Sequence, residues 1–75
     1  MEDKILKQFA KRLKKLREDR ALSQEELALK SNLDRTYIGR IERAERNPSL
    51  KSLYKIAVAL DLSLPELVDL DSLND

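Results

Sequence analysis

Apolar side chains recur every three or four residues near the start of the chain, which is the period of an amphipathic helix. The repeating positions are Ile5, Leu6, Phe9, Leu13 and Leu16. The lysines of the same segment fall mostly on the other faces, and we interpret them as a solvated surface. The pattern therefore predicts a first helix over residues 4–20.

Residues suited to helix N-termini mark the beginnings of four shorter helices. Ser23 and Ser63 each stand three residues before a glutamate, which is the spacing of a capping box. Asp34 and Ser49 are favoured N-cap residues as well. Further helices are expected over residues 24–30, 35–43, 50–60 and 64–70. The residues expected to point inward from the fourth helix are Leu50, Leu53, Ile56, Ala57 and Leu60.

The five helices predict an all-α fold in a single domain over residues 1–75. The chain has 75 residues and contains no cysteine and no histidine. Disulfides are thereby excluded, and neither a metal site nor a cofactor is expected. Because small domains often need a further stabiliser, a partner subunit is the common one that remains.

The net charge of +1 conceals an uneven distribution. Residues 1–20 carry eight basic and four acidic side chains, residues 21–60 carry seven and five, and residues 61–75 carry none and five. A basic body is thus followed by an acidic tail. The sequence has no signal-peptide pattern and no apolar run of the ~20 residues that a membrane helix needs. We therefore expect a cytoplasmic protein that makes no contact with a membrane.

The stretch over residues 24–43 combines two short helices with a tight turn. Ala28 lies where the two helices are expected to cross, and Asn32 tolerates the left-handed backbone that the turn requires. The exposed face of the second helix is expected to hold Arg35, Thr36, Gly39, Arg40 and Arg43. That face has hydrogen-bond donors and no carboxylate, and such a helix fits the major groove of DNA.

This stretch resembles the helix-turn-helix regulators of the Cro/C1 type, also called the XRE family. The resemblance covers residues 6–68 and includes the SQEELA opening of the first motif helix, the SNLD turn and the IER end of the second helix. The run SNLDRTYIGRIERAERNPSLKSL is similar to the controller proteins of restriction-modification systems. The resemblance implies a compact five-helix, lambda-repressor-like fold. It also implies a homodimer that binds an inverted-repeat operator in double-stranded DNA.

Two positions depart from the usual sequence pattern of this family. Asn32 stands where many members have glycine, and Gly39 stands where many have a polar recognition residue. The second departure removes one of the base contacts that the family pattern would otherwise imply.

Base reading is expected of the second motif helix and of the loop after it. Arg35 is the leading candidate, because arginine binds guanine O6 and N7 in bidentate fashion and a cation at a helix N-terminus is otherwise unfavourable. Thr36 and Arg40 face the same groove. Tyr37 either contacts DNA or packs at the edge of the core, and we place it with the base readers. The resemblance adds Arg46 of the loop.

Phosphate contacts are expected at the edges of the motif. Gln24 begins the first motif helix, where free amides attract phosphate, and the resemblance implies the same role for it. Ser23 is first of all a cap and secondarily a phosphate ligand. Arg43 and Asn47 follow the recognition helix and are expected to hold the DNA backbone.

Glu42 is an acid on an otherwise cationic helix, which is costly near DNA unless the acid is paired. The resemblance implies a bidentate ion pair with Arg17 of the first helix. Such a pair would be shielded from water and would fix the first helix to the recognition helix.

The end of the chain is rich in apolar residues for so short a helix. The set includes Leu62, Leu64, Leu67, Val68 and Leu70. Some of them would be exposed in a monomer, and in the resembling family the fifth helix makes a two-fold interface. We therefore predict a dimer interface within residues 60–70. Its residues are Leu62, Leu64, Leu67 and Val68. The alternative is that all of them pack on the first helix.

The predicted function is sequence-specific DNA binding by a homodimeric transcription regulator that controls a restriction-modification system. A phage-type repressor is the alternative within this class, and RNA polymerase is a further candidate partner. A protein-interaction module of antitoxin or coactivator type is the alternative outside it. An enzyme is excluded, because the sequence lacks histidine, cysteine, a glycine-rich phosphate loop and a convincing carboxylate pair.

Overall fold

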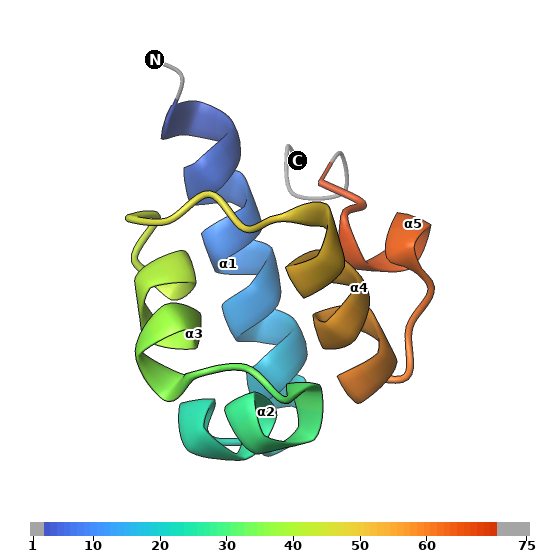
Figure 1. Ribbon diagram of the computed structural model, residues 1–75. Helices are drawn as coiled ribbons and strands as arrows, with labels where there is room; N and C mark the ends of the chain where they lie inside the picture. The colour runs from blue at the N-terminus through green and yellow to red at the C-terminus, as the bar shows by residue number, and fades with distance from the viewer. Residues whose placement is uncertain (1–2, 71–75) are drawn as a thin grey trace.

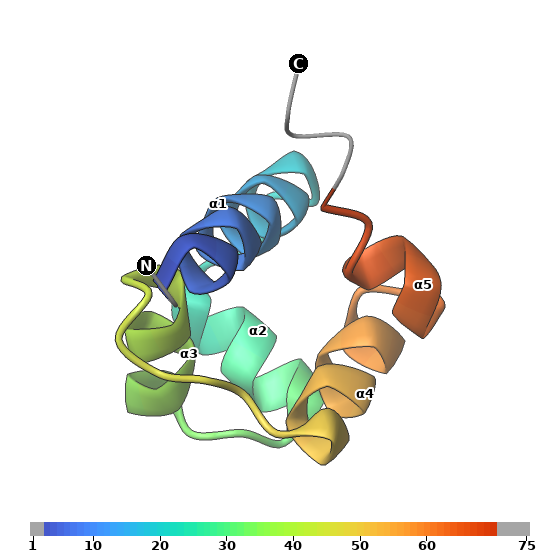
Figure 2. The ribbon, with the colours of Figure 1, turned by 90° about the horizontal axis from the view of Figure 1, so that it is seen from above.

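Five helices surround a common interior in the computed structural model, which describes residues 3–70 (Figures 1 and 2). They are α1 (Asp3–Asp19), α2 (Gln24–Ser31), α3 (Arg35–Glu42), α4 (Leu50–Ala59) and α5 (Leu64–Leu67). The described residues contain no strand, so the predicted all-α fold is confirmed. None of these helices is long and apolar enough to cross a membrane.

The predicted caps begin the four shorter helices. The Ser23 hydroxyl accepts the amide of Glu26 at 3.0 Å, and the Glu26 carboxylate accepts the amide of Ser23 at 2.8 Å. Ser63 and Glu66 form the same reciprocal pair. The serine backbone amide, which donates to the carboxylate, is the main cause that holds the pKa of both glutamates below the ordinary value of 4.5, and the serine side chain lowers it further. Asp34 and Ser49 cap α3 and α4 through their side chains.

Each of the first four helices is followed by one residue with left-handed backbone. Asn32 has φ of 57°, as its place in the turn predicts. The other three are Ala21, Ala44 and Asp61, with φ between 55° and 60°. Alanine is not a residue that favours this conformation, so these two turns were not recognisable from residue type.

The core is formed by side chains from all five helices. Its fully buried members include Leu13, Leu27, Ile38, Ile41, Ile56, Leu60 and Leu67. Two residues that were expected to point inward lie outside it: Leu50 is 71% exposed and Ile5 is 59% exposed. Leu50 shares an outward row, spaced four residues apart, with Tyr54 and Val58, because the core-facing side of α4 is set by Ile56, Ala57 and Leu60.

Arginines in α1 and directly after it connect this helix to the others. Arg12 donates to the carbonyl oxygen of Glu66 in α5, and Arg20 donates to the carbonyl oxygen of Leu60 at the end of α4. Arg17 reaches toward α3. The lysines of α1 are exposed on its outer side. The arginines of this segment thus contact other parts of the fold, whereas its lysines stay on the surface.

Candidate nucleic-acid interface

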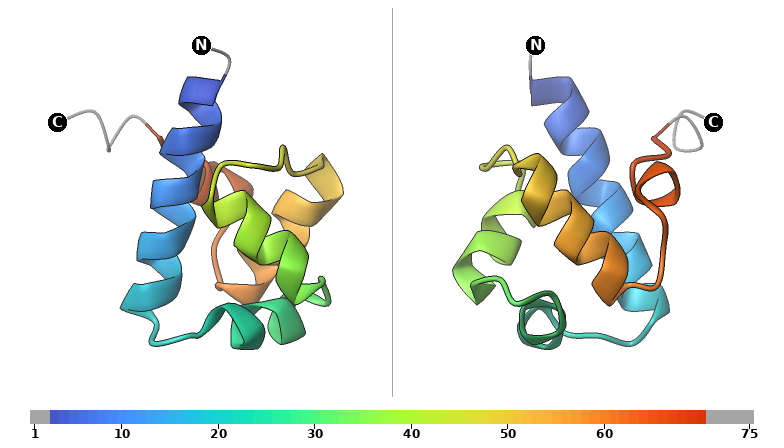
Figure 3. Two further views of the ribbon diagram at one scale, coloured as in Figure 1. Left: turned by 90° about the vertical axis from the view of Figure 1, so that its left-hand side faces the viewer. Right: turned by 45° about the vertical axis from the view of Figure 1, so that its right-hand side comes forward.

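The arrangement of α2 and α3 is that of a helix-turn-helix. Ala28 is buried where the two helices pack, and its carbonyl oxygen accepts the amide of Leu33 in the turn. Ile38 and Ile41 turn the inner side of α3 toward the core. In the left view of Figure 3, α3 lies at the front of the molecule with α2 below it, so the outer side of α3 is open to a ligand.

The outer side of α3 carries side chains that are free to bind. Arg35, Thr36 and Arg40 are exposed, and no side-chain hydrogen bond or ion pair occupies them within the described residues. Asp34 accepts the backbone amide of Thr36 at 3.1 Å, which fixes the first turn from which two of them project. Arg43 pairs with Glu45 at 3.1 Å, but both side chains are more than half exposed, so the contact is weak.

Tyr37 is joined to the loop between α3 and α4. Its hydroxyl accepts the amide of Ser49 at 3.3 Å, and the guanidinium of Arg46 lies 5.2 Å from the centre of its ring. Burial raises the pKa of Tyr37, but hydrogen bonds with Ser52 and Ser49 and the charge of Arg46 outweigh burial and lower it. The half-buried ring therefore packs at the core edge and supports Arg46, whose charged end remains at the surface.

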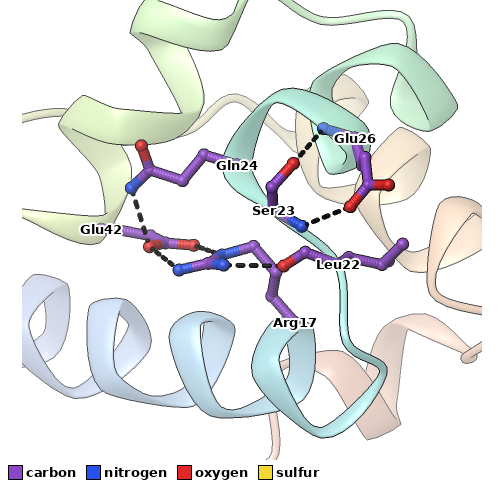
Figure 4. Close-up of polar contacts among 6 residues, drawn as sticks. All are labelled: Arg17, Leu22, Ser23, Gln24, Glu26 and Glu42. Carbon is purple, nitrogen blue, oxygen red and sulfur yellow. Dashed lines mark hydrogen bonds and ion pairs between the residues drawn. The ribbon is translucent and has the colours of Figure 1, made fainter.

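The acid of α3 is turned into the protein (Figure 4). The Glu42 carboxylate accepts two hydrogen bonds from Arg17, at 2.6 Å from Nε and 2.9 Å from Nη2, and its side chain is only 3% exposed. Arg17 also donates to the carbonyl oxygen of Leu22 at 2.7 Å. The hydrogen bonds with Glu42 raise the pKa of Arg17 despite its burial. The bidentate pair expected between these residues is therefore formed.

A third hydrogen bond to this carboxylate was not anticipated. Gln24 donates from Nε2 to Glu42 at 3.0 Å, so one acid contacts side chains of both α1 and α2 (Figure 4). This hydrogen bond fixes the orientation of the Gln24 side chain at the beginning of α2. A carboxylate on an otherwise cationic helix was the only signal in the sequence that could have suggested a second partner.

Gly39 lies between two of the predicted phosphate ligands. A Cβ atom at this position would lie 3.2 Å from Nη1 of Arg43 and 3.6 Å from Oε1 of Gln24. The two side chains cover the glycine, which is buried although it lies on the outer side of α3. Gln24 and Arg43 thus converge from different helices on one part of the surface. Ser23 is exposed next to them, and Asn47 is exposed in the loop with Arg46.

Comparison with known proteins identifies the family of this arrangement. A family model described as helix-turn-helix matches residues 13–67. The chain belongs to this helix-turn-helix family. Control protein C.MunI from a Mycoplasma species is 48% identical over 60 residues, which cover 79% of this chain and 81% of that protein.

Two solved structures of controller proteins resemble this helix-turn-helix protein in fold. The restriction-modification controller protein C.AhdI from Aeromonas hydrophila has 50% identity and a TM-score of 0.81, covering 83% of this chain and 94% of that one. C.Esp1396I bound to a 19 base pair DNA duplex has 41% identity and a TM-score of 0.84, covering 92% and 93%. The likeness to controller proteins expected from the motif is confirmed.

The predicted dimer residues do not share one environment in this helix-turn-helix protein. Leu67 is fully buried, because α5 turns it into the core, so its prediction as an interface residue is wrong. Leu62 and Leu64 are half-buried against the core, and Val68 is 39% exposed. The helix also ends at Leu67 rather than at residue 70, which leaves less helical surface than expected.

The larger exposed apolar surface lies on α4. Leu50, Tyr54 and Val58 recur at intervals of four residues, and each is more than half exposed. We call these three residues the α4 stripe. The periodicity of α4 could have suggested it, because apolar residues cover more of this helix than one core-facing side can use.

Proposed function

We propose that this protein is a homodimeric regulator that binds an inverted-repeat operator and controls a restriction-modification system. Membership of the family makes the chain a DNA-binding transcription regulator. One observation carries the proposal furthest: the acid of α3, Glu42, is withdrawn into the pair with Arg17, so α3 presents cations and donors without an exposed carboxylate. Such a surface suits the negatively charged major groove.

The environments of the side chains support a division of roles. Arg35, Thr36 and Arg40 are free on the outer side of α3 and are assigned to base edges. Arg46 joins them from the loop, with Tyr37 beneath it as its support. Arginine is the residue best suited to a bidentate contact with guanine, so Arg35 near the beginning of α3 is the principal reader.

The phosphate ligands lie around this group. Gln24 and Arg43 flank Gly39, and their convergence supports a shared contact with one stretch of the DNA backbone. Ser23 before α2 and Asn47 in the loop after α3 are exposed as well. Contacts of this kind hold the protein in register on the duplex and carry no sequence information of their own.

The dimer surface is assigned to the α4 stripe, and Val68, which follows α5, is a further exposed apolar residue that could join it. A symmetric dimer formed there would present two α3 helices to half-sites about one helical turn apart, roughly 34 Å. Leu62 and Leu64 contribute only their exposed edges. This assignment replaces the surface that was expected from residues 60–70.

The test compares Arg35→Ala with Arg43→Ala on duplexes selected by the parent protein and on scrambled duplexes, at several salt concentrations. Loss of a base reader costs about 1–3 kcal/mol at one base position and relaxes the preference there. Loss of a phosphate contact weakens binding to all sequences and flattens the salt dependence. Arg35→Ala should therefore reduce the gap between selected and scrambled DNA, and Arg43→Ala should leave the gap unchanged.

Two outcomes would contradict this assignment. Equal weakening of both duplexes by Arg35→Ala would make Arg35 a backbone ligand. A parent protein that selects no inverted repeat would favour a protein-interaction module instead. The restriction-modification part of the proposal has a separate test, because genes for an endonuclease and a methyltransferase should lie beside the coding sequence.

A further inference from the structure

A row of four lysines runs along the outer side of α1. Lys4, Lys7, Lys11 and Lys14 follow one another at intervals of three or four residues, and all are exposed. At 1.5 Å of rise per residue the row extends about 15 Å along the helix axis. We call these four residues the lysine face.

The lysine face takes part in no ion pair within the part of the chain that the structure describes. The neighbouring Lys15, by contrast, contacts Asp19 at 3.3 Å. Arg12, Arg17 and Arg20 are engaged with other elements. The positive charge of the lysine face is therefore available to an external ligand.

Helix stability does not account for this arrangement. Like charges three or four residues apart destabilise a helix, and the lysine face contains three such neighbouring pairs. A ligand that binds the lysines would offset this repulsion.

The composition of the surface favours DNA as that ligand. Lysine is depleted in protein–protein interfaces, which are anchored by aromatic and apolar residues, and the lysine face contains neither. Interfaces with DNA are far more positive. A membrane would require the apolar side of the helix, but Phe9, Leu13 and Leu16 of α1 are buried in the core.

The position of α1 indicates which part of the DNA the lysines meet. In the left view of Figure 3, α1 and α4 lie on opposite sides of α3. The α4 stripe is assigned to the dimer interface and therefore lies toward the centre of the operator. The opposite side, where α1 lies, then lies toward its outer end.

We propose that the lysine face binds the phosphate backbone of the duplex that flanks the operator. The inference rests on the proposed function and extends the DNA contact beyond the helix-turn-helix motif. It adds affinity without adding sequence preference, because the contacts are with phosphates alone. It also adds salt dependence, at about 0.9 in the slope of log K against log salt for each phosphate neutralised.

The test uses two duplexes that share one selected operator. The first ends at the operator, and the second continues for about 15 base pairs on each side, long enough to pass the ~15 Å lysine face. The parent should bind the longer duplex more tightly and with a steeper salt dependence. The triple variant Lys7→Gln, Lys11→Gln and Lys14→Gln should bind both duplexes alike. Its affinity for the shorter duplex should equal that of the parent.

A matched control has the same change of charge elsewhere. Lys30→Gln, Lys51→Gln and Lys55→Gln removes three exposed lysines from α2 and α4 and should retain the advantage of the longer duplex. Thermal unfolding should show the lysine-face variant to be at least as stable as the parent, because repulsion along α1 is relieved. A lower melting temperature would contradict the absence of internal partners.

Other results would overturn the inference. If the parent gains nothing from the longer duplex while binding the shorter one tightly, the lysine face does not contact flanking DNA, and the proposed function stands. If the triple variant weakens binding to both duplexes equally, the lysines act only through the general charge of the protein. If the parent binds neither duplex, the proposed function fails together with this inference.

Discussion

The pair between Arg17 and Glu42 makes a quantitative prediction for Glu42→Gln. The substitution keeps the size of the side chain and removes its charge, leaving a guanidinium whose side chain is 10% exposed without a counterion. Removing one member of a buried pair costs roughly 3–5 kcal/mol. The lower end applies here, because Arg17 keeps its hydrogen bond to the carbonyl oxygen of Leu22.

A loss of about 3 kcal/mol is large for this chain. A domain of 75 residues has a free energy of unfolding of about 4–11 kcal/mol, and each kcal/mol lowers the melting temperature by about 4–8 °C. The melting temperature of Glu42→Gln should therefore fall by at least about 12 °C. Thermal and urea unfolding followed by circular dichroism measure the change, and the sequence preference on DNA should be unaltered.

Glu45→Gln is the matched control. The Glu45 carboxylate also accepts a hydrogen bond from an arginine, but its side chain is 54% exposed. The substitution should change the free energy of unfolding by less than about 1 kcal/mol. In the double variant Arg17→Met and Glu42→Met, both charges are removed together, and the loss should be much smaller than the sum of the single losses. Equal effects of Glu42→Gln and Glu45→Gln would refute the reasoning.

Two further predictions concern the dimer and the capping boxes. Val58→Asp places a charge on the α4 stripe and should weaken dimerisation by about 2 kcal/mol or more in sedimentation experiments. Leu29→Asp, on a still more exposed apolar residue of α2, should not weaken it. Leu67→Asp should instead unfold the protein, and a folded monomer in its place would contradict the burial of Leu67. Because the folded-state pKa of Glu26 and Glu66 is lowered, their contribution to stability is present above pH 4.5 and is lost as the pH falls below it. The melting temperature of Glu26→Gln with Glu66→Gln should decline less in acid than that of the parent, and an equally steep decline would show that the capping boxes are not responsible.

Local chemistry made much of the fold predictable from the sequence. Ser23 and Ser63 each act within four residues of chain, and Asn32 has one of the few side chains that tolerate its backbone. Such signals require no knowledge of how the helices pack. The pair of Arg17 with Glu42 joins distant segments, and it was predictable only through the resemblance to a family.

The features that depend on packing were not predictable in the same way. A leucine at position 50 or 67 has the same apolar character, and only the rotation of α4 and α5 against the core decides that Leu50 is exposed and Leu67 is buried. The same holds for Arg12 and Arg20, because their roles depend on the carbonyl groups of Glu66 and Leu60 in distant segments. The support of Arg46 by Tyr37 depends on how the loop after α3 folds back.

Gly39 gives this recognition helix room to change. It is the single glycine of the chain, and its backbone does not need glycine, because its φ is not positive. Within a helix it costs about 1 kcal/mol relative to alanine. A Cβ atom there would meet only the ends of Arg43 and Gln24, which can move aside. Gly39 thus adds no side chain to the surface that we propose to read base edges, and a single mutation there would add one without altering the fold. Regulators that descend from one such protein would acquire different operator preferences through substitution at this one position.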